Sequence, residues 1–255
     1  MTTTQHHTNG AQPSVVPVNE RRKQERGPAI WLAGDPEDLK EWMPRGAVGI
    51  VTNTVVLNDM VQKYGQVTDV VKRYLDITDK PVVVEIDGHT TQELLDVGEV
   101  FVKMAPGRII LKIPTTEYAL DAFAELKRQN VETFCTTVFT LSQAAAVAQA
   151  GVTHVLPFCE PYREVNGDPT RLVRDCRAMF TGWEDRPYVT AALVRSVETA
   201  ESCLRDGADG IIVFWPIFRD MIKNKLTSEW NATFLDRWNQ MYDAGLMEGV
   251  PVIRH

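Results

Sequence analysis

From residue 29 onward, short apolar runs alternate with amphipathic stretches along the chain. Each run is apolar on both faces, which is typical of parallel strands that helices cover. Eight candidate strands are predicted in this way, at residues 29–33, 48–52, 82–86, 109–113, 133–138, 154–158, 188–193 and 210–214.

The stretches between these runs carry helix signals. Asp35 followed by Pro36 predicts a helix start, because Asp is a good N-cap and Pro is tolerated at the first helical position. The stretches 141–150 and 196–206 are each followed by a glycine, the residue favoured just past a helix end. One amphipathic face, with apolar residues three and four apart, is formed by Ala119, Ala122, Phe123 and Leu126.

Eight strand–helix units within about 220 residues predict an α/β fold, a single (β/α)8 TIM barrel. A doubly wound open sheet is the alternative, but it usually carries a Gly-rich first turn, which the sequence lacks. Residues 1–27 are polar and contain few apolar positions, so we expect a mobile N-terminal tail before a catalytic domain at 28–255.

The last helical pattern, residues 229–246, is rich in aromatic side chains spaced mostly three to four apart. One interpretation, which we favour, is a C-terminal helix that covers its own barrel. The alternative is a helix whose aromatic residues pack on a neighbouring subunit. We also expect a homo-oligomer.

Composition narrows the classes of partner. The net charge of -7 argues against nucleic acid or an anionic membrane surface as a partner. No apolar run approaches the roughly 20 residues of a membrane-spanning helix. The four cysteines show no CxxC pair and indicate reduced thiols, so we expect a cytoplasmic protein without a metal site.

Polar side chains gather at the carboxyl ends of the predicted strands, where a barrel carries its chemistry. In chain order these ends and the residues just after them present Asn53, Glu85, Asp87, Lys112, Thr136, Phe158, Arg163, Arg195 and Trp215. Buried polar groups must be paired, so either a structural network or a reactive site is expected there.

Lys112 is the most informative of these residues. It lies in the apolar run 109–113, where a charged lysine is costly to bury and its pKa is expected to fall. A neutral amine can attack a carbonyl and form a Schiff base. The alternative is an edge strand whose lysine reaches solvent.

The ordered motifs resemble the transaldolase family, in particular its short branch that includes fructose-6-phosphate aldolase. The match extends over roughly residues 29 to 245 and rests on Gly-Ile-Val-Thr-Asn-Thr at 49–54, Glu-Ile-Asp at 85–87, Leu-Lys-Ile-Pro at 111–114, Thr-Thr-Val-Phe at 136–139, Pro-Phe at 157–158 and Ala-Asp-Gly-Ile at 208–211.

The resemblance implies roles for five residues. Lys112 matches the Schiff-base lysine, and Asn53 matches the asparagine near it. Glu85 matches the carboxylate that positions a catalytic water together with Thr136. Phe158 matches the aromatic residue at the end of the sixth strand. Glu85 and Phe158 are transaldolase-like, on a chain of aldolase-like length.

Two departures fall on the first strands. The family has an Asp at the end of the first strand that handles a substrate hydroxyl proton, and Ala33 stands at that position. Asp35 is two residues farther on, where we expect it to cap the next helix. Thr54 replaces a proline in the second motif.

Two more departures concern the phosphate of the family's substrates. Pro161 replaces a phosphate-binding Arg, with Arg163 close by in sequence, and Leu193 replaces a Ser, while the basic partner is kept as Arg195. Charge-assisted hydrogen bonds are strong, so their loss predicts weaker sugar-phosphate binding.

We therefore expect a cofactor-free Schiff-base enzyme that makes or breaks a C–C bond of a ketose or related hydroxyketone. Its substrate would be specialised, with a place in secondary metabolism. The alternatives are an imine-forming dehydratase or isomerase on the same scaffold, and a catalytically silent barrel that binds a ligand.

Overall fold

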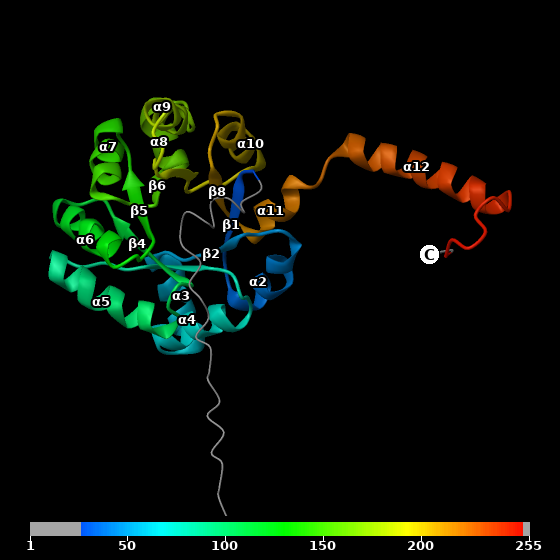
Figure 1. Ribbon diagram of the computed structural model, residues 1–255. Coiled ribbons are helices and arrows are strands. Elements are labelled where there is room, and N and C mark those ends of the chain that lie inside the picture. Colours follow the sequence, from blue (N-terminus) through cyan, green and yellow to red (C-terminus); the bar gives the residue numbers. More distant parts are fainter. Residues whose placement is uncertain (1–26, 252–255) are drawn as a thin grey trace, which may run out of the picture. The chain divides into compact units, whose positions relative to one another are not determined.

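The computed structural model describes residues 27–251, and eight parallel strands form its centre (Figure 1). They are β1 (Ala29–Ala33), β2 (Gly49–Val51), β3 (Val82–Glu85), β4 (Ile109–Pro114), β5 (Thr133–Val138), β6 (His154–Pro157), β7 (Tyr188–Ala191) and β8 (Gly210–Phe214). Neighbouring strands pair in chain order, and β8 pairs with β1 from Ala29↔Gly210 to Ala33↔Phe214. The sheet is a closed barrel, as the sequence predicts.

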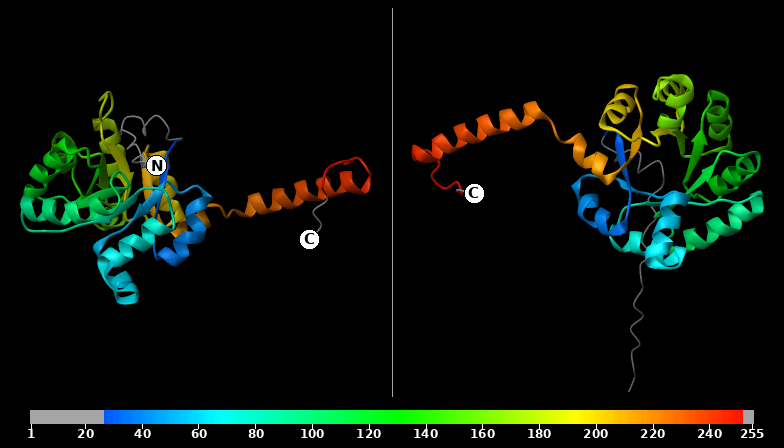
Figure 2. Two further views of the ribbon diagram at one scale, coloured as in Figure 1. Left: turned by 60° about the horizontal axis from the view of Figure 1, so that its bottom comes forward. Right: turned by 180° about the vertical axis from the view of Figure 1, so that it is seen from behind.

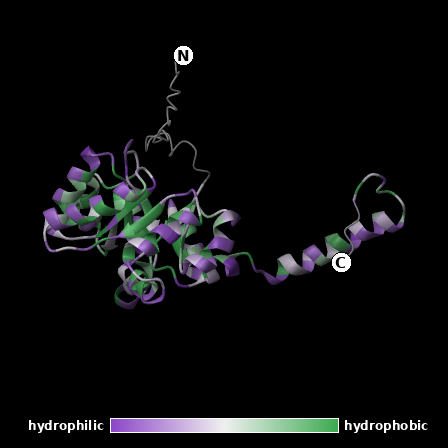
Figure 3. Ribbon diagram, turned by 90° about the horizontal axis from the view of Figure 1, so that it is seen from below, coloured by the Kyte–Doolittle hydropathy of each residue, from purple (hydrophilic) through white to green (hydrophobic). Residues whose placement is uncertain are grey.

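Helices follow the strands and surround them, as Figures 1 and 2 show. Those around the barrel are α2 (Pro36–Trp42), the short 3-10 helix η1 (Met43–Arg45), α3 (Thr54–Tyr64), α4 (Val67–Asp76), α5 (Thr91–Met104), α6 (Glu117–Arg128), α7 (Leu141–Ala150), α8 (Cys159–Asn166), α9 (Arg171–Met179) and α10 (Val197–Arg205). Two more helices follow β8 in the chain, α11 (Trp215–Met221) and α12 (Lys225–Asp243). Figure 3 shows hydrophobic strands inside and hydrophilic turns on the outer faces of the surrounding helices.

Short polar side chains start many of these helices directly after a strand. Asp35 accepts a hydrogen bond from the Glu37 N–H and caps α2, and Asn53 accepts one from the Val56 N–H and caps α3. Thr90, Thr116, Thr140 and Ser196 cap α5, α6, α7 and α10 in the same way. Such caps satisfy N–H groups that have no partner within the helix, so each chain reversal stays short.

One layer of the barrel interior is filled by apolar side chains from every strand. Its buried members are Ala29, Trp31, Val51, Val83, Ile110, Phe134, Leu156 and Ala192, with Val48, Phe158 and Ile212 packed against them. Gly49 is needed beside Trp31, because a Cβ there would lie 2.3 Å from the indole ring and 2.7 Å from the Pro81 carbonyl. This packed layer is the floor on which the site is built.

The described chain divides into two compact units, one ending at Trp215 and the other beginning at Pro216. The second unit contains α12, in which no residue is buried. The expectation that one domain extends from 28 to 255 therefore stays a prediction. The tail expected at 1–27 lies outside the described residues except for Gly27.

Candidate active site

The inward-facing residues at the carboxyl ends of the strands lie directly above the apolar layer. Side chains alternate between the two faces of a strand, so a residue two positions beyond a member of that layer faces inward again. Seven strands supply such a residue: Ala33 follows Trp31, Asn53 follows Val51, Glu85 follows Val83, Lys112 follows Ile110, Thr136 follows Phe134, Phe158 follows Leu156 and Phe214 follows Ile212. We call these seven the mouth residues.

Lys112 and Glu85 are in direct contact at the mouth. Glu85 on β3 and Lys112 on β4 are register partners, and Lys112 Nζ lies 2.5 Å from Glu85 Oε2. The two side chains are only 7% and 11% exposed. Burial lowers the pKa of Lys112 below its ordinary value of 10.5, and the charge of Glu85 opposes part of that shift. The alternative of a lysine that reaches solvent is therefore wrong.

Thr52, the residue directly after β2, forms hydrogen bonds with both residues of this pair. Lys112 Nζ donates a 3.0 Å hydrogen bond to the Thr52 carbonyl. The Thr52 hydroxyl donates to the Val83 carbonyl and accepts from the Glu85 N–H, at 3.0 and 3.1 Å. Thr52 is thus bonded to the amine of Lys112 and to the backbone of Glu85.

Thr136 brings a hydroxyl to the mouth from β5. It is fully buried, and its Oγ1 makes no hydrogen bond to any of residues 27–251. A buried hydroxyl without a partner costs about 1–3 kcal/mol, so this oxygen is suited to bind a ligand oxygen.

The backbone next to Thr136 is strained. Thr137 has φ 58, which is unusual for a β-branched residue, and the β5–β6 pairing shifts register between Cys135 and Val138. The Thr137 hydroxyl accepts from the Thr115 N–H and donates to the Thr136 carbonyl. These bonds offset the strain and fix the end of β5.

Two other predicted residues, Asn53 and Asp87, are bonded to partners other than Lys112 and Glu85. Asn53 is half-buried, and its Oδ1 accepts the α3 cap bond at 2.7 Å, so the amide Nδ2 is the atom that can meet a ligand. Asp87 is exposed in the loop after β3, where it accepts a hydrogen bond from the Gly88 N–H. Neither the hydrogen bonds nor the ion pair of Lys112 among the described residues involve Asp87.

Phe158 and Arg163 lie after β6. Phe158 packs on the apolar layer and makes an edge-on contact with Phe139, with 5.5 Å between ring centroids. Arg163 on α8 is bound by Glu160, 3.0 Å away, and it donates to the Thr199 hydroxyl at 2.9 Å. Its charge is thus already paired.

The structure does not bring Arg195 and Trp215 to Lys112. Arg195 is exposed in the loop between β7 and α10. Trp215 follows the inward-facing Phe214, so its side chain points away from the barrel interior. Its ring stacks on Trp42, with 5.7 Å between the ring centroids, and its Nε1 donates a hydrogen bond to Asp38. Both contacts are on α2, in the outer layer, so the geometry gives no support to the predicted substrate contact of Trp215.

Sequence reasoning missed two residues, Thr52 and Phe214. Thr52 acts on Lys112 through its backbone carbonyl, which no side-chain pattern reveals. Phe214 could have been found by counting alternate positions along β8 from Ile212.

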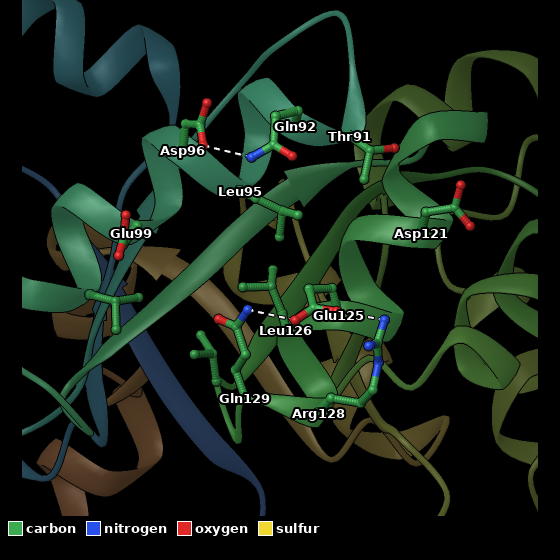
Figure 4. Close-up of a pocket in the computed structure, with 12 residues that line it drawn as sticks. Thr91, Gln92, Leu95, Asp96, Glu99, Asp121, Glu125, Leu126, Arg128 and Gln129 are labelled. Carbon is green, nitrogen blue, oxygen red and sulfur yellow. Dashed lines mark hydrogen bonds and ion pairs between the residues drawn. The ribbon is translucent and has the colours of Figure 1, made fainter.

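No group of three or more His, Cys, Asp or Glu side chains that could hold a metal ion is found between residues 27 and 251. In the same range no helix is long and apolar enough to cross a membrane. A separate hollow lies between α5 and α6 (Figure 4). On its rim, Gln92 donates a hydrogen bond to Asp96 on α5, and Arg128 forms an ion pair with Glu125 on α6. It belongs to the outer helical layer and contains none of the mouth residues.

Comparison with known proteins agrees with this geometry. A sequence model described as "Transaldolase/Fructose-6-phosphate aldolase" matches residues 52–243. A "Probable transaldolase" of Herpetosiphon aurantiacus is 29% identical over 212 residues, which cover 82% of this chain and 95% of that protein. Proteins of the same name are 26% identical in Streptococcus agalactiae serotype V, over 80% of this chain and 95% of the relative, and 25% identical in Thermoplasma volcanium, over 82% and 93%. The chain is a divergent member of the transaldolase/fructose-6-phosphate aldolase family, and thus an enzyme of transaldolase type.

Proposed function

We propose that this enzyme forms a Schiff base between Lys112 and a ketose or related hydroxyketone, and makes or breaks a C–C bond next to the imine carbon. The observation that carries the proposal is the buried contact between Lys112 Nζ and Glu85 Oε2, 2.5 Å apart. Desolvation lowers the pKa of the amine, and a neutral amine is the form that attacks a carbonyl.

The pair supplies the protons that imine formation needs. Transfer of one proton from Lys112 to Glu85 leaves a neutral amine and a carboxylic acid. The amine adds to the substrate carbonyl and gives a carbinolamine. Glu85 then returns the proton to the carbinolamine hydroxyl, which leaves as water. We assign the orientation of that oxygen to Thr136, and the support is that its buried hydroxyl has no partner among the described residues.

The protonated imine then accepts the electron pair of the C–C bond that breaks, or supplies a nucleophilic carbon after loss of a proton. No acidic side chain stands at the end of β1, because Ala33 occupies that position and is 4% exposed. A second candidate follows from this residue: the same imine could undergo dehydration or isomerisation, which does not need a base at β1.

Borohydride trapping tests the proposal. The enzyme is incubated with dihydroxyacetone or fructose 6-phosphate and reduced, and the adduct is located by intact mass and peptide mapping. We expect one adduct on Lys112 that is absent in Lys112→Met. A Lys103→Met variant is the matched control, because Lys103 is exposed on α5.

Other results have separate meanings. Adducts distributed over surface lysines, or none with any ketone, would refute the proposal and favour a ligand-binding barrel without imine chemistry. An adduct on Lys112 without aldol products, but with dehydrated or isomerised ones, would select the second candidate.

A further inference from the structure

The mouth is divided into a polar and an apolar sector. The polar sector, on β2 to β5, consists of Asn53, Glu85, Lys112 and Thr136. The apolar sector comes from β6, β8 and β1 and consists of Phe158 after β6, Phe214 at the end of β8 and Ala33 at the end of β1, with the buried Ala192 after β7 in the layer below. A substrate bound covalently to Lys112 must present the rest of its skeleton to this second sector.

Phe214 and Ala33 are neighbours in the apolar sector. They are register partners across β8 and β1. Phe214 is 41% exposed although it faces inward, whereas Ala33 is 4% exposed. The phenyl ring of Phe214 is therefore accessible at the mouth, and the neighbouring position, Ala33, carries only a methyl group. Phe158 and its partner Phe139, which is 37% exposed, continue the aromatic surface toward β5.

One charged pair near this sector is already neutralised. Glu160 and Arg163 pair with each other, and the Thr199 hydroxyl donates to Glu160 Oε1 at 2.7 Å while it accepts from Arg163. An anionic group that approached Arg163 would have to displace Glu160. Arg195 is the remaining basic residue of the loops after β6 and β7, and it lies exposed.

From this division we infer that the substrate carries an uncharged apolar or aromatic group beyond its reacting carbonyl, which packs on Phe214 and Phe158 over Ala33. A polyhydroxylated chain fits the sector poorly, because its hydroxyls would lose water and gain no hydrogen bond there. The inference rests on the proposed Schiff base at Lys112 and names the class of carbonyl compound for that site.

Reductive trapping on Lys112 with three ketones tests the inference. The probes are hydroxyacetone, 1-hydroxy-4-phenylbutan-2-one and fructose 6-phosphate, and the concentration that gives half-maximal trapping is measured for each. We expect the phenyl ketone to half-saturate at a concentration at least about tenfold lower than hydroxyacetone, because single apolar groups in such pockets contribute about 10–200-fold. Fructose 6-phosphate is expected to half-saturate at a higher concentration than the phenyl ketone.

Variants assign the preference to Phe214. In Phe214→Ser the advantage of the phenyl ketone should fall about tenfold or more, while Phe214→Leu should keep most of it. A circular dichroism spectrum and a Tm like those of the parent enzyme show that Phe214→Ser is folded. Trp183→Ser is the matched control: Trp183 is 40% exposed and precedes β7, at the opposite end of the strands from the mouth, so the preference should stay.

The outcomes separate this inference from the proposed function. Trapping on Lys112 with fructose 6-phosphate at concentrations equal to or below those of the phenyl ketone overturns the inference alone. The same holds if Phe214→Ser keeps the full preference. No trapping with any of the three ketones overturns the proposed function, and this inference with it.

Discussion

Replacement of Glu85 by Gln should move the titration of Lys112 to lower pH. In the fold, burial already lowers the pKa of Lys112 below 10.5, and the carboxylate of Glu85 counteracts part of this effect. Glutamine has nearly the shape of glutamate without its charge. The variant therefore removes the interaction that favours the ammonium form and leaves the desolvation in place.

The size of the shift follows from the geometry of the pair. Lys112 Nζ and Glu85 Oε2 are 2.5 Å apart, and both side chains are nearly inaccessible to water. An opposite charge at such close range shifts a pKa by about 1–3 units, and each unit corresponds to about 1.4 kcal/mol. We thus expect the pKa of Lys112 in Glu85→Gln to lie about 1–3 units below that in the unmodified enzyme.

Competitive labelling with 1-fluoro-2,4-dinitrobenzene measures this pKa directly, because an amine reacts with it only in the neutral form. Labelling of the Lys112 peptide is followed over a series of pH values in both proteins, and each midpoint is read from the curve. This reaction does not require Glu85 as an acid or base, so a loss of catalysis does not confuse the result.

A second ion pair of the same chain provides the control. Lys103 and Glu99 are 2.7 Å apart on α5, but their side chains are 70% and 64% exposed. Exposed pairs contribute little, so Glu99→Gln is the matched substitution and should leave the labelling curve of the Lys112 peptide unchanged. A Lys112 midpoint that stays unchanged or rises in Glu85→Gln would refute the account of its lowered pKa.

Three further outcomes are expected. Gly49→Ala should lower the free energy of unfolding by at least about 1–3 kcal/mol, because the new methyl overlaps the Trp31 ring; an unchanged Tm would contradict the packing argument. Asp209→Asn should cost about 1–3 kcal/mol in urea unfolding, since Asp209 binds both Arg186 NH groups at 2.7 and 2.8 Å, and an unchanged urea midpoint would show that this pair adds nothing. We propose that copies of the chain associate through the aromatic face of α12, where Trp230 is 59% exposed; Trp230→Ser should then reduce the mass in sedimentation, and a monomeric parent enzyme would disprove it.

The strand positions were predictable because apolar runs between helix signals are what a barrel strand requires. All eight observed strands begin within one residue of their predicted start. The largest error is at β7, which ends at Ala191 and not at residue 193. The apolar run continues past that point, but Leu193 adopts φ 52, so the extended pairing ends although the composition does not change.

The site was predictable as far as side-chain chemistry shows in the sequence. A lysine in an apolar strand and a glutamate at the end of the preceding strand indicated the contact between Lys112 and Glu85. Thr52 binds Lys112 through its backbone carbonyl. Every residue type has this group, so the sequence does not indicate the contact. Trp215 comes directly after β8 in the sequence, but side chains alternate between the two faces of a strand, so Phe214 faces the mouth and Trp215 packs on α2.

The division of the mouth makes chemistry and specificity separable in this chain. The reacting amine is held by hydrogen bonds and charge within β2 to β4, through Thr52, Glu85 and Lys112. The apolar sector acts through packing alone, since Phe214 and Ala33 have no polar side-chain atom to connect to that network. A substitution at Phe214 or Ala33 should therefore change which carbonyl compound is bound while the pKa of Lys112 stays the same. We propose that Ala33, in place of a carboxylate, changes the kind of substrate that the barrel accepts and leaves the residues proposed for imine formation intact.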